Sequence, residues 1–174
     1  MSSTPSGARV ALASEGSANV ATGLPVLDHL VGELARAARF RIALEVAPDS
    51  SDEAVAAAGA ALGGAVRSRL QSGTGWALMP AAEALASAAL EADEEPRLVT
   101  NADFSDIRLG GVSNDVASAF LAELAQGAGI NLHVRVLEGD DPQHVLAAIF
   151  KAVGAALGQA CRPAPTSTEE EEGS

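Results

Sequence analysis

The sequence contains one pattern of helix, strand, turn and helix twice, about 90 residues apart. The segment ELARAARFRIALEV at 33–46 aligns with ELAQGAGINLHVRV at 123–136, and Glu, Leu, Ala and Val match at their positions. After each turn, DEAVAAAGAALGGAV at 52–66 aligns with QHVLAAIFKAVGAAL at 143–157. Few residues are identical, but the order of elements is the same in both copies. Because internal repetition constrains architecture more than any single motif does, the sequence predicts an α+β fold made by tandem duplication.

The second copy shows the clearest local pattern. Apolar and polar residues alternate along 130–137, which is typical of a strand with one buried face. After a turn that ends at Pro142, apolar residues recur at three- and four-residue spacing, which indicates a helix opening at Gln143. His133 is therefore expected on the polar face of the strand, and His144 in the first turn of the helix.

The remaining elements follow from the same rules, and one segment is ambiguous. The region from Pro80 to Leu90 fits either a short helix or a strand, and the two stay open. A Gly-rich turn at Gly127 and Gly129 is expected before the last strand. The other predictions are strands at 9–13, 40–46 and 97–101, helices over 24–40, 52–70 and 114–126, and a loop at 107–112.

Composition and charge narrow the classes of molecule that this protein can bind. The chain of 174 residues is 48% hydrophobic but only 3% aromatic, so its core must come from small side chains on closely approaching helices. A net charge of -12 argues against nucleic acid or an anionic membrane as general partner, because both require a basic surface. The single Cys161 cannot form an internal disulfide, and no apolar run reaches the roughly 18 residues of a membrane span. We expect a cytoplasmic protein.

The ends of the chain differ in composition from its middle. We expect a disordered lead at 1–7, one domain at 8–162 with halves of about 8–90 and 91–162, and an acidic, disordered tail at 163–174. The tail carries four consecutive glutamates.

Three segments, in order, resemble those of one enzyme family. TGLPVLDHLVGELA resembles a Thr-Gly-x-x-Phe-x-Asp-His-Met-Leu segment, LAQGAGINLHVRVLEG a Leu-Ala-x-x-Ala-x-x-Thr-Leu-His-Ile segment, and QHVLAAIFKAVGAALGQA a His-His-x-x-Glu-Ala-x-Phe-Lys-Ala segment. These are segments of imidazoleglycerol-phosphate dehydratase, and the resemblance runs from about Thr22 to Cys161. It implies two sheets packed on helices, as in the second domain of ribosomal protein S5.

The resemblance also implies an assembly and a chemistry. Members of the family form trimers, and eight trimers close into a 24-subunit shell with active sites between subunits. Each site holds two manganese ions, and the reaction removes water from a phosphorylated glycerol side chain in histidine biosynthesis. In the family, the imidazole ring of the substrate binds the metal and serves as the electron sink. The metal suits this role because it is a Lewis acid. The implied partners are therefore copies of this chain and a small phosphorylated imidazole.

Carried over by position, the family's metal ligands are only partly present. His29, His133 and His144 fall on ligand positions, and these are all the histidines of the chain. The earlier His-His-x-x-Glu falls on Asp52, Glu53 and Ala56, and the later one on Gln143, His144 and Ala147. Five of the eight positions implied by the resemblance are thus changed. Asp52 and Glu53 remain candidate ligands, because carboxylate oxygens suit manganese, but no catalytic residue can be assigned.

The phosphate-binding positions are also reduced. By the resemblance, Arg108 and Lys151 supply positive charge for the substrate phosphate, whereas other basic positions have no counterpart. Asp140 and Asp141 replace a basic residue and an Asn, and would repel a phosphate. The resemblance therefore indicates an imidazoleglycerol-phosphate dehydratase-like protein whose activity is impaired or lost. The alternative is a non-catalytic paralogue that acts as an assembly component or binds a small anion.

Overall fold

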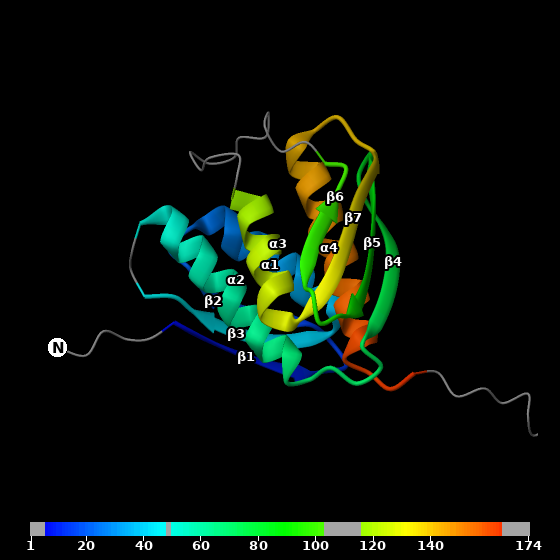
Figure 1. Cartoon of the computed structure of the whole chain (residues 1–174). Coiled ribbons are helices and arrows are strands. Elements are labelled where there is room, and N and C mark those ends of the chain that lie inside the picture. Colours follow the sequence, from blue (N-terminus) through cyan, green and yellow to red (C-terminus); the bar gives the residue numbers. More distant parts are fainter. Residues whose placement is uncertain (1–5, 48–49, 103–115, 165–174) are drawn as a thin grey trace, which may run out of the picture.

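The computed structural model describes residues 6–47, 50–102 and 116–164. Helices and groups of one to three strands follow one another along these residues (Figure 1). The elements are β1 (Gly7–Leu12), β2 (Ser17–Ala21), α1 (Pro25–Ala38), β3 (Phe40–Glu45), α2 (Ser51–Arg67), β4 (Thr74–Ala81), β5 (Ala84–Ala92), β6 (Arg97–Thr100), α3 (Val116–Ala128), β7 (Ile130–Glu138) and α4 (Pro142–Ala160).

The two sheets repeat one topology, which confirms the predicted duplication. In the first sheet, with order β1-β3-β2, β3 pairs antiparallel with β1 and parallel with β2. In the second sheet, with order β4-β5-β7-β6, β7 pairs antiparallel with β5 and parallel with β6. The order β5, β6, α3, β7, α4 therefore matches β1, β2, α1, β3, α2, and β4 is an added edge strand.

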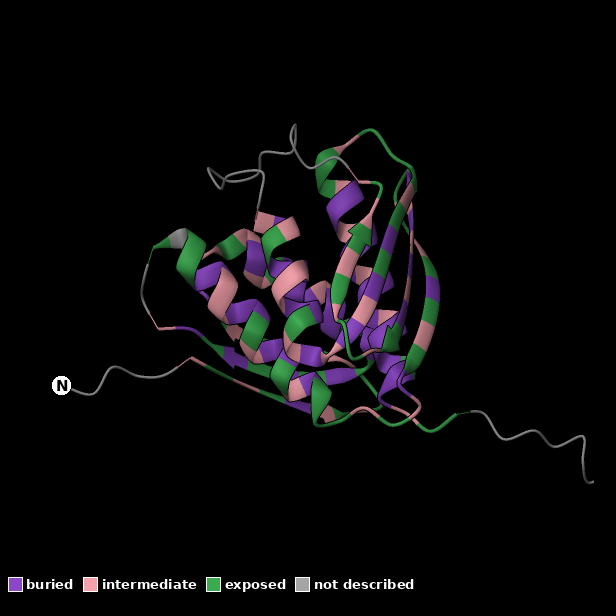
Figure 2. Cartoon of the chain, viewed as in Figure 1, coloured by how far each residue is buried: buried purple, intermediate pink, exposed green. Residues whose placement is uncertain are grey.

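The helices lie between the two sheets and join the halves crosswise. α1 and α2 pack on the first sheet, α3 and α4 pack on the second, and across the middle α1 contacts α4 while α2 contacts α3 (Figure 1). Buried residues concentrate where the helices meet one another and the inner sheet faces (Figure 2). Phe120 and Phe150 stack at the centre with ring centroids 5.6 Å apart.

Glycines allow these helices to approach as closely as the composition predicts. A Cβ at Gly154 of α4 would lie 2.2 Å from the carbonyl oxygen of Leu34 in α1. A Cβ at Gly63 of α2 would lie 2.6 Å from the carbonyl oxygen of Leu124 in α3. Each crosswise contact therefore depends on backbone packing directly against backbone.

The structure settles the ambiguous segment and corrects one predicted turn. Residues 80–90 form strands rather than a helix: β4 ends at Ala81 and β5 begins at Ala84. Gly127 does not lie in a turn; it is in α3, where a Cβ would lie 2.7 Å from the carbonyl oxygen of Ala60. Gly129 does form the turn, with φ of 68°.

Cys161 is fully buried at the end of α4. Burial raises the pKa of its thiol to about 11, so the side chain acts as a small apolar residue. None of the helices in the described residues is long and apolar enough to cross a bilayer.

Candidate functional site

The start of α4 is fixed by local capping. Asp141 is the N-cap residue, and its Oδ1 accepts a hydrogen bond of 2.8 Å from the backbone N–H of Gln143. Pro142 occupies the first turn, where its fixed φ suits a helix and its missing N–H costs nothing. These two residues set the direction in which the next side chains leave the helix.

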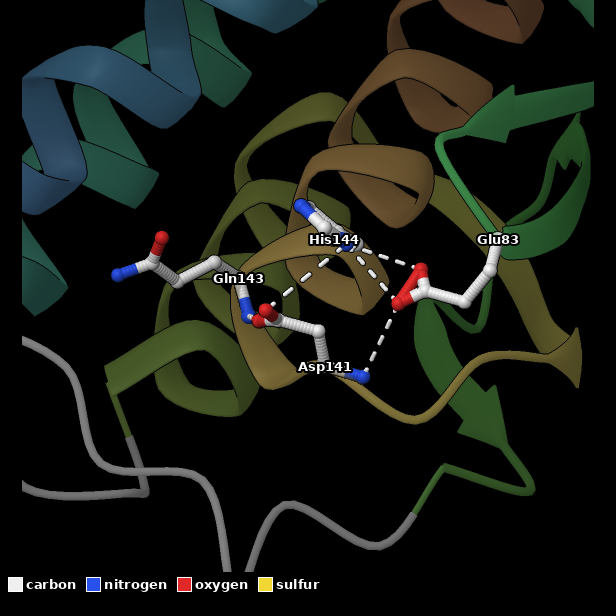
Figure 3. Close-up of polar contacts among 4 residues, drawn as sticks. All are labelled: Glu83, Asp141, Gln143 and His144. Atoms are coloured by element: carbon white, nitrogen blue, oxygen red, sulfur yellow. Dashed lines mark hydrogen bonds and ion pairs between the residues drawn. The ribbon is translucent and has the colours of Figure 1, made fainter.

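His144 is held by Glu83, which lies in the tight turn between β4 and β5 (Figure 3). Its Nδ1 is 2.9 Å from both carboxylate oxygens of Glu83 and 3.9 Å from Oδ2 of Asp141. The backbone N–H of Asp141 donates to Glu83 Oε1 at 3.2 Å, so one carboxylate fixes both the ring and the helix start. The side chain of Gln143 extends away from this pair (Figure 3).

The pair has consequences for protonation. The hydrogen bond from the ring raises the pKa of His144, and the same bond lowers the pKa of Glu83. When the imidazole is neutral, a proton on Nδ1 donates to Glu83 and leaves the Nε2 lone pair for a ligand. A carboxylate in this role is the usual device that orients a metal-binding His.

Lys151, a predicted phosphate ligand, lies two helical turns after His144 on the same face of α4. Its ammonium group donates a hydrogen bond of 2.6 Å to the backbone carbonyl of Pro80 in β4. Further along α4, the side-chain amide of Gln159 bonds to both the N–H and the carbonyl of Trp76. Lys151 and Gln159 therefore hold the edge strand β4 against α4. The Lys151 ammonium group has two further hydrogens that can be donated to a ligand.

His133 points outward from β7, as the alternation predicted. In register across the second sheet, Trp76, Ala89, His133 and Val99 form one row. Trp76, Ala89 and His133 of this row line a cleft of about 720 Å³, which is also lined by Asn131 and Arg162. Within the described structure, Asn131 Oδ1 is the one buried side-chain oxygen or nitrogen without a hydrogen-bond partner. His133 thus lies in a largely apolar, concave surface.

His29 is exposed on α1, with Nε2 3.8 Å from Glu33 Oε1. The residue before it helps to fix the helix start, because Asp28 accepts hydrogen bonds from the backbone N–H and the hydroxyl of buried Thr22. Thr22 in turn accepts from the N–H of Leu24. Asp28 therefore stabilises the helix start, whereas the next residue in the sequence, His29, is exposed to solvent.

The corresponding start of α2 has no histidine. Ser50 is its N-cap and accepts a hydrogen bond of 3.4 Å from the backbone N–H of Glu53. Asp52 and Glu53 are exposed in the first turn, where the positive end of the helix dipole stabilises negative charge. Arg108 lies outside the described residues.

The predicted ligands do not come together within one chain. In the ranges the structure describes, no group of three or more His, Cys, Asp or Glu side chains is arranged to hold a metal ion. Ala56 and Ala147 present methyl groups where the family pattern has carboxylates. Within one chain, the described residues therefore do not fit a two-manganese centre.

Glu83 was missed by the sequence analysis. It is the only charged residue in the run ALMPAAEALASAAL, so it resembles an ordinary solvated turn residue. Its partner is 61 positions away, and no local spacing indicates such a pairing. Only a prediction of the β4–β5 hairpin would have brought it toward the start of α4.

Comparison with known proteins gives a consistent result. The family model described as imidazoleglycerol-phosphate dehydratase matches residues 22–157. The dehydratase of Pelobacter propionicus is 34% identical over 158 residues, which are 86% of this chain and 81% of that protein. The dehydratase of Symbiobacterium thermophilum is 35% identical over 153 residues, which are 83% of this chain and 74% of that protein.

Two solved structures share the fold. The dehydratase of Staphylococcus aureus aligns with a TM-score of 0.80 at 21% identity and covers 89% of this chain and 92% of that one. The enzyme of Pyrococcus furiosus aligns with a TM-score of 0.77 at 23% identity and covers 97% of both chains. Together with the duplicated topology, the match over residues 22–157 shows that this chain belongs to the imidazoleglycerol-phosphate dehydratase family.

Proposed function

We propose that this protein is a member of the imidazoleglycerol-phosphate dehydratase family whose dehydratase activity is strongly reduced or lost. The observation that carries the proposal is the composition of the two helix starts. On α2 the positions of the His-His-x-x-Glu pattern are Asp52, Glu53 and Ala56, and on α4 His144 is the one imidazole that remains. A methyl group cannot coordinate a cation, so neither start can supply the full ligand set.

The chemistry implied by the family depends on that set. Loss of water from the substrate's side chain leaves electron density on an imidazole ring, and bound metal is the group that would accept it. What this chain contributes is a single oriented imidazole at His144, a carboxylate at Glu83 that holds it, and the Lys151 ammonium on the same face. These groups can position one small ligand, but they do not replace two cations.

We propose that one manganese ion at most is held, between subunits rather than within one. His144 leaves Nε2 for a ligand, and His133 and His29 are both exposed. Neutral imidazole nitrogens are suitable ligands for such an ion. Asp52 and Glu53 of a neighbouring copy are the carboxylates that the resemblance assigns to complete it.

We further propose that the chain forms a symmetric, trimer-based assembly of the family type. Support comes from the outward face of the second sheet, where Trp76 is 62% exposed, Leu78 44% and Val99 42%. Exposed apolar residues gathered on one face are typical of a protein interface. His133 lies in the same row, so a neighbour bound at this face would lie next to it.

Complementation tests the proposed loss of activity. A bacterial strain that requires histidine because it lacks the dehydratase is given this chain, and a relative with the full His-His-x-x-Glu pattern serves as positive control. We expect no growth, or growth much slower than with the control, at matched protein levels. Growth at the control's rate would contradict the proposal.

Metal analysis tests the proposed cation. Protein purified without a histidine tag is equilibrated with manganese and compared with the double variant His133→Ala, His144→Ala. We expect at most one ion per subunit in the unaltered chain and a clear loss in the double variant. Equal metal content in the two proteins would rule out a site at these histidines. Light scattering on both samples reports the mass of the assembly, and a monomeric mass would contradict the assembly.

A further inference from the structure

Three arginines gather where the edge strand β1 meets the end of α2. Arg9 on β1, Arg41 on β3 and Arg69 just after α2 line a hollow of about 450 Å³, and we call them the arginine cluster. Arg9 lies opposite Ala43, and Arg41 lies opposite Ala11. Arg9 and Arg41 are therefore diagonal neighbours on one sheet face, about 7–8 Å apart at Cα.

None of the three arginines forms an ion pair with a carboxylate of the described residues, although Glu45 of β3 lies diagonal to Arg9 on the same sheet face. Among described residues, the arginines in ion pairs are Arg36, with Glu33, and Arg97, with Glu95. Arg69 donates from Nε to the carbonyl oxygen of Val10 at 3.0 Å, which aims its guanidinium at the β1 edge. Three unpaired cations in a chain of net charge -12 form a local site for an anion.

The cluster lies beside the end of α4. At the end of α2, the carbonyl oxygen of Val66 is 3.9 Å from Cys161 Sγ. The backbone N–H of Gln71 donates to the carbonyl of Ala160 at 2.9 Å. Arg69 lies between Val66 and Gln71 in the chain, so the polypeptide that leaves α4 starts close to the cluster.

An acidic run follows α4 in the chain. Four consecutive glutamates occupy 169–172, and four residues lie between Glu169 and Ala164, the last residue described, which lines the cleft beside Trp76 and His133. The five residue steps from Ala164 to Glu169 span at most about 17 Å. We propose that the glutamate run at 169–172 docks on the arginine cluster of its own chain. In this arrangement the run occupies the hollow and competes with any anion from solution.

Physical chemistry sets the strength of this contact. An exposed ion pair contributes only about 0–1 kcal/mol, and several charges on each side add to form a network. The attraction between exposed charges is screened over about 10 Å at 0.1 M salt. The docked state should therefore be reversible and should weaken as salt concentration rises.

The chain's single lysine makes a direct test possible. A carbodiimide joins a lysine amine to a carboxylate it touches, and Lys151 is the only lysine present. Arg9→Lys and Arg41→Lys each place a new amine in the cluster. Arg135→Lys places one on the exposed face of the other sheet and serves as matched control.

After coupling in low salt, the full-length proteins are digested and the joined peptides identified by mass spectrometry. We expect links between 169–172 and Lys at position 9 or 41, several-fold more than with the Arg135→Lys control, at the mass of one chain. The links should decrease in high salt and disappear when the four glutamates are changed to glutamine. No link, equal links in the control, or links found only at the mass of two chains would overturn the proposal. Circular dichroism of each variant establishes that it is folded.

Discussion

The two halves of the molecule build the same scaffold but carry different helix starts. In the first half, α2 begins with two exposed acids after Ser50. In the second half, α4 begins with His144 held by Glu83, and Glu83 comes from the hairpin that the added strand β4 creates. The described strands of the first sheet include no counterpart of β4. Duplication therefore preserved the framework, while the orientation of His144 depends on a hairpin that only the second half shows among the described residues.

The largest expected effect tests the shared framework. Gly154→Ala places a Cβ against the backbone of Leu34, so we expect a loss of about 1–3 kcal/mol or more in the free energy of unfolding. The matched control is Gly64→Ala in α2, where nothing lies within 4 Å of the added Cβ. That variant should gain up to about 1 kcal/mol from helix propensity. Denaturant unfolding followed by circular dichroism measures both, and similar values for the two would contradict the close packing of α1 on α4.

The next prediction compares the starts of α2 and α4 by their affinity for manganese. Gln143→His with Ala147→Glu restores the family pattern on α4, and Asp52→His, Glu53→His with Ala56→Glu restores it on α2. We expect the α4 variant to bind manganese more tightly, because Glu83 already orients His144. Adding Glu83→Gln to the α4 variant should weaken binding by about 10–100-fold. Metal titration measures this, and equal affinity of the two restored starts would remove the distinction between the halves.

A smaller expected effect is the pH dependence of thermal stability. Glu83 raises the pKa of His144 above 6.5, so the His144 contribution to stability is present below that value and is lost as pH rises through the folded-state pKa. The pKa of Glu83 is lowered from 4.5, so its contribution is present above that value and is lost as pH falls through the folded-state pKa. The Tm difference between the unaltered chain and Glu83→Gln should therefore be greatest between about pH 4.5 and 6.5.

The control for that profile is Glu33→Gln, because Glu33 pairs at 2.8 Å with Arg36, which stays charged over this pH range, and lies 3.8 Å from His29, against 2.9 Å between Glu83 and His144. We expect its Tm difference to vary less with pH. Thermal melts from pH 3 to 9 provide the profile. A flat profile for Glu83→Gln would indicate that the Glu83–His144 pair does not form in solution.

The smallest effect concerns the hairpin itself. Ala82 has φ of 51°, a left-handed conformation that costs a residue with a Cβ about 1–2 kcal/mol. Ala82→Gly relieves that cost but increases the freedom of the unfolded chain, so we expect a net gain below about 1 kcal/mol. Ala60→Gly in the exposed part of α2 should instead lose about 1 kcal/mol. Opposite signs in denaturant unfolding would confirm the strained turn.

The sequence predicted the framework well because its signals are local. Alternation along 130–137 and the apolar spacing after Pro142 indicate β7 and the start of α4 without reference to the rest of the chain. β4 was missed because its apolar side chains, Trp76 and Leu78, face outward, whereas small residues face α4. That arrangement reverses the usual pattern of a half-buried strand.

The candidate site was less predictable, and the reasons are physical. Resemblance to the family indicated His144, but the orientation of its ring depends on Glu83, which is distant in sequence. Lys151 was predicted as a phosphate ligand, and its hydrogen bond to Pro80 emerged only from the packing of α4 on β4. Whether His29 and His133 approach His144 depends on how copies of the chain meet, which no single chain specifies.

The bonds that Gln159 and Lys151 make to β4 have a consequence for how copies of this protein can associate. They occupy main-chain groups along the free margin of the second sheet, where an incoming strand would otherwise extend the ladder. Extension of the second sheet through its β4 margin is thereby discouraged. A neighbour that approaches this margin would meet side chains of α4 bonded to the strand instead of free main-chain groups.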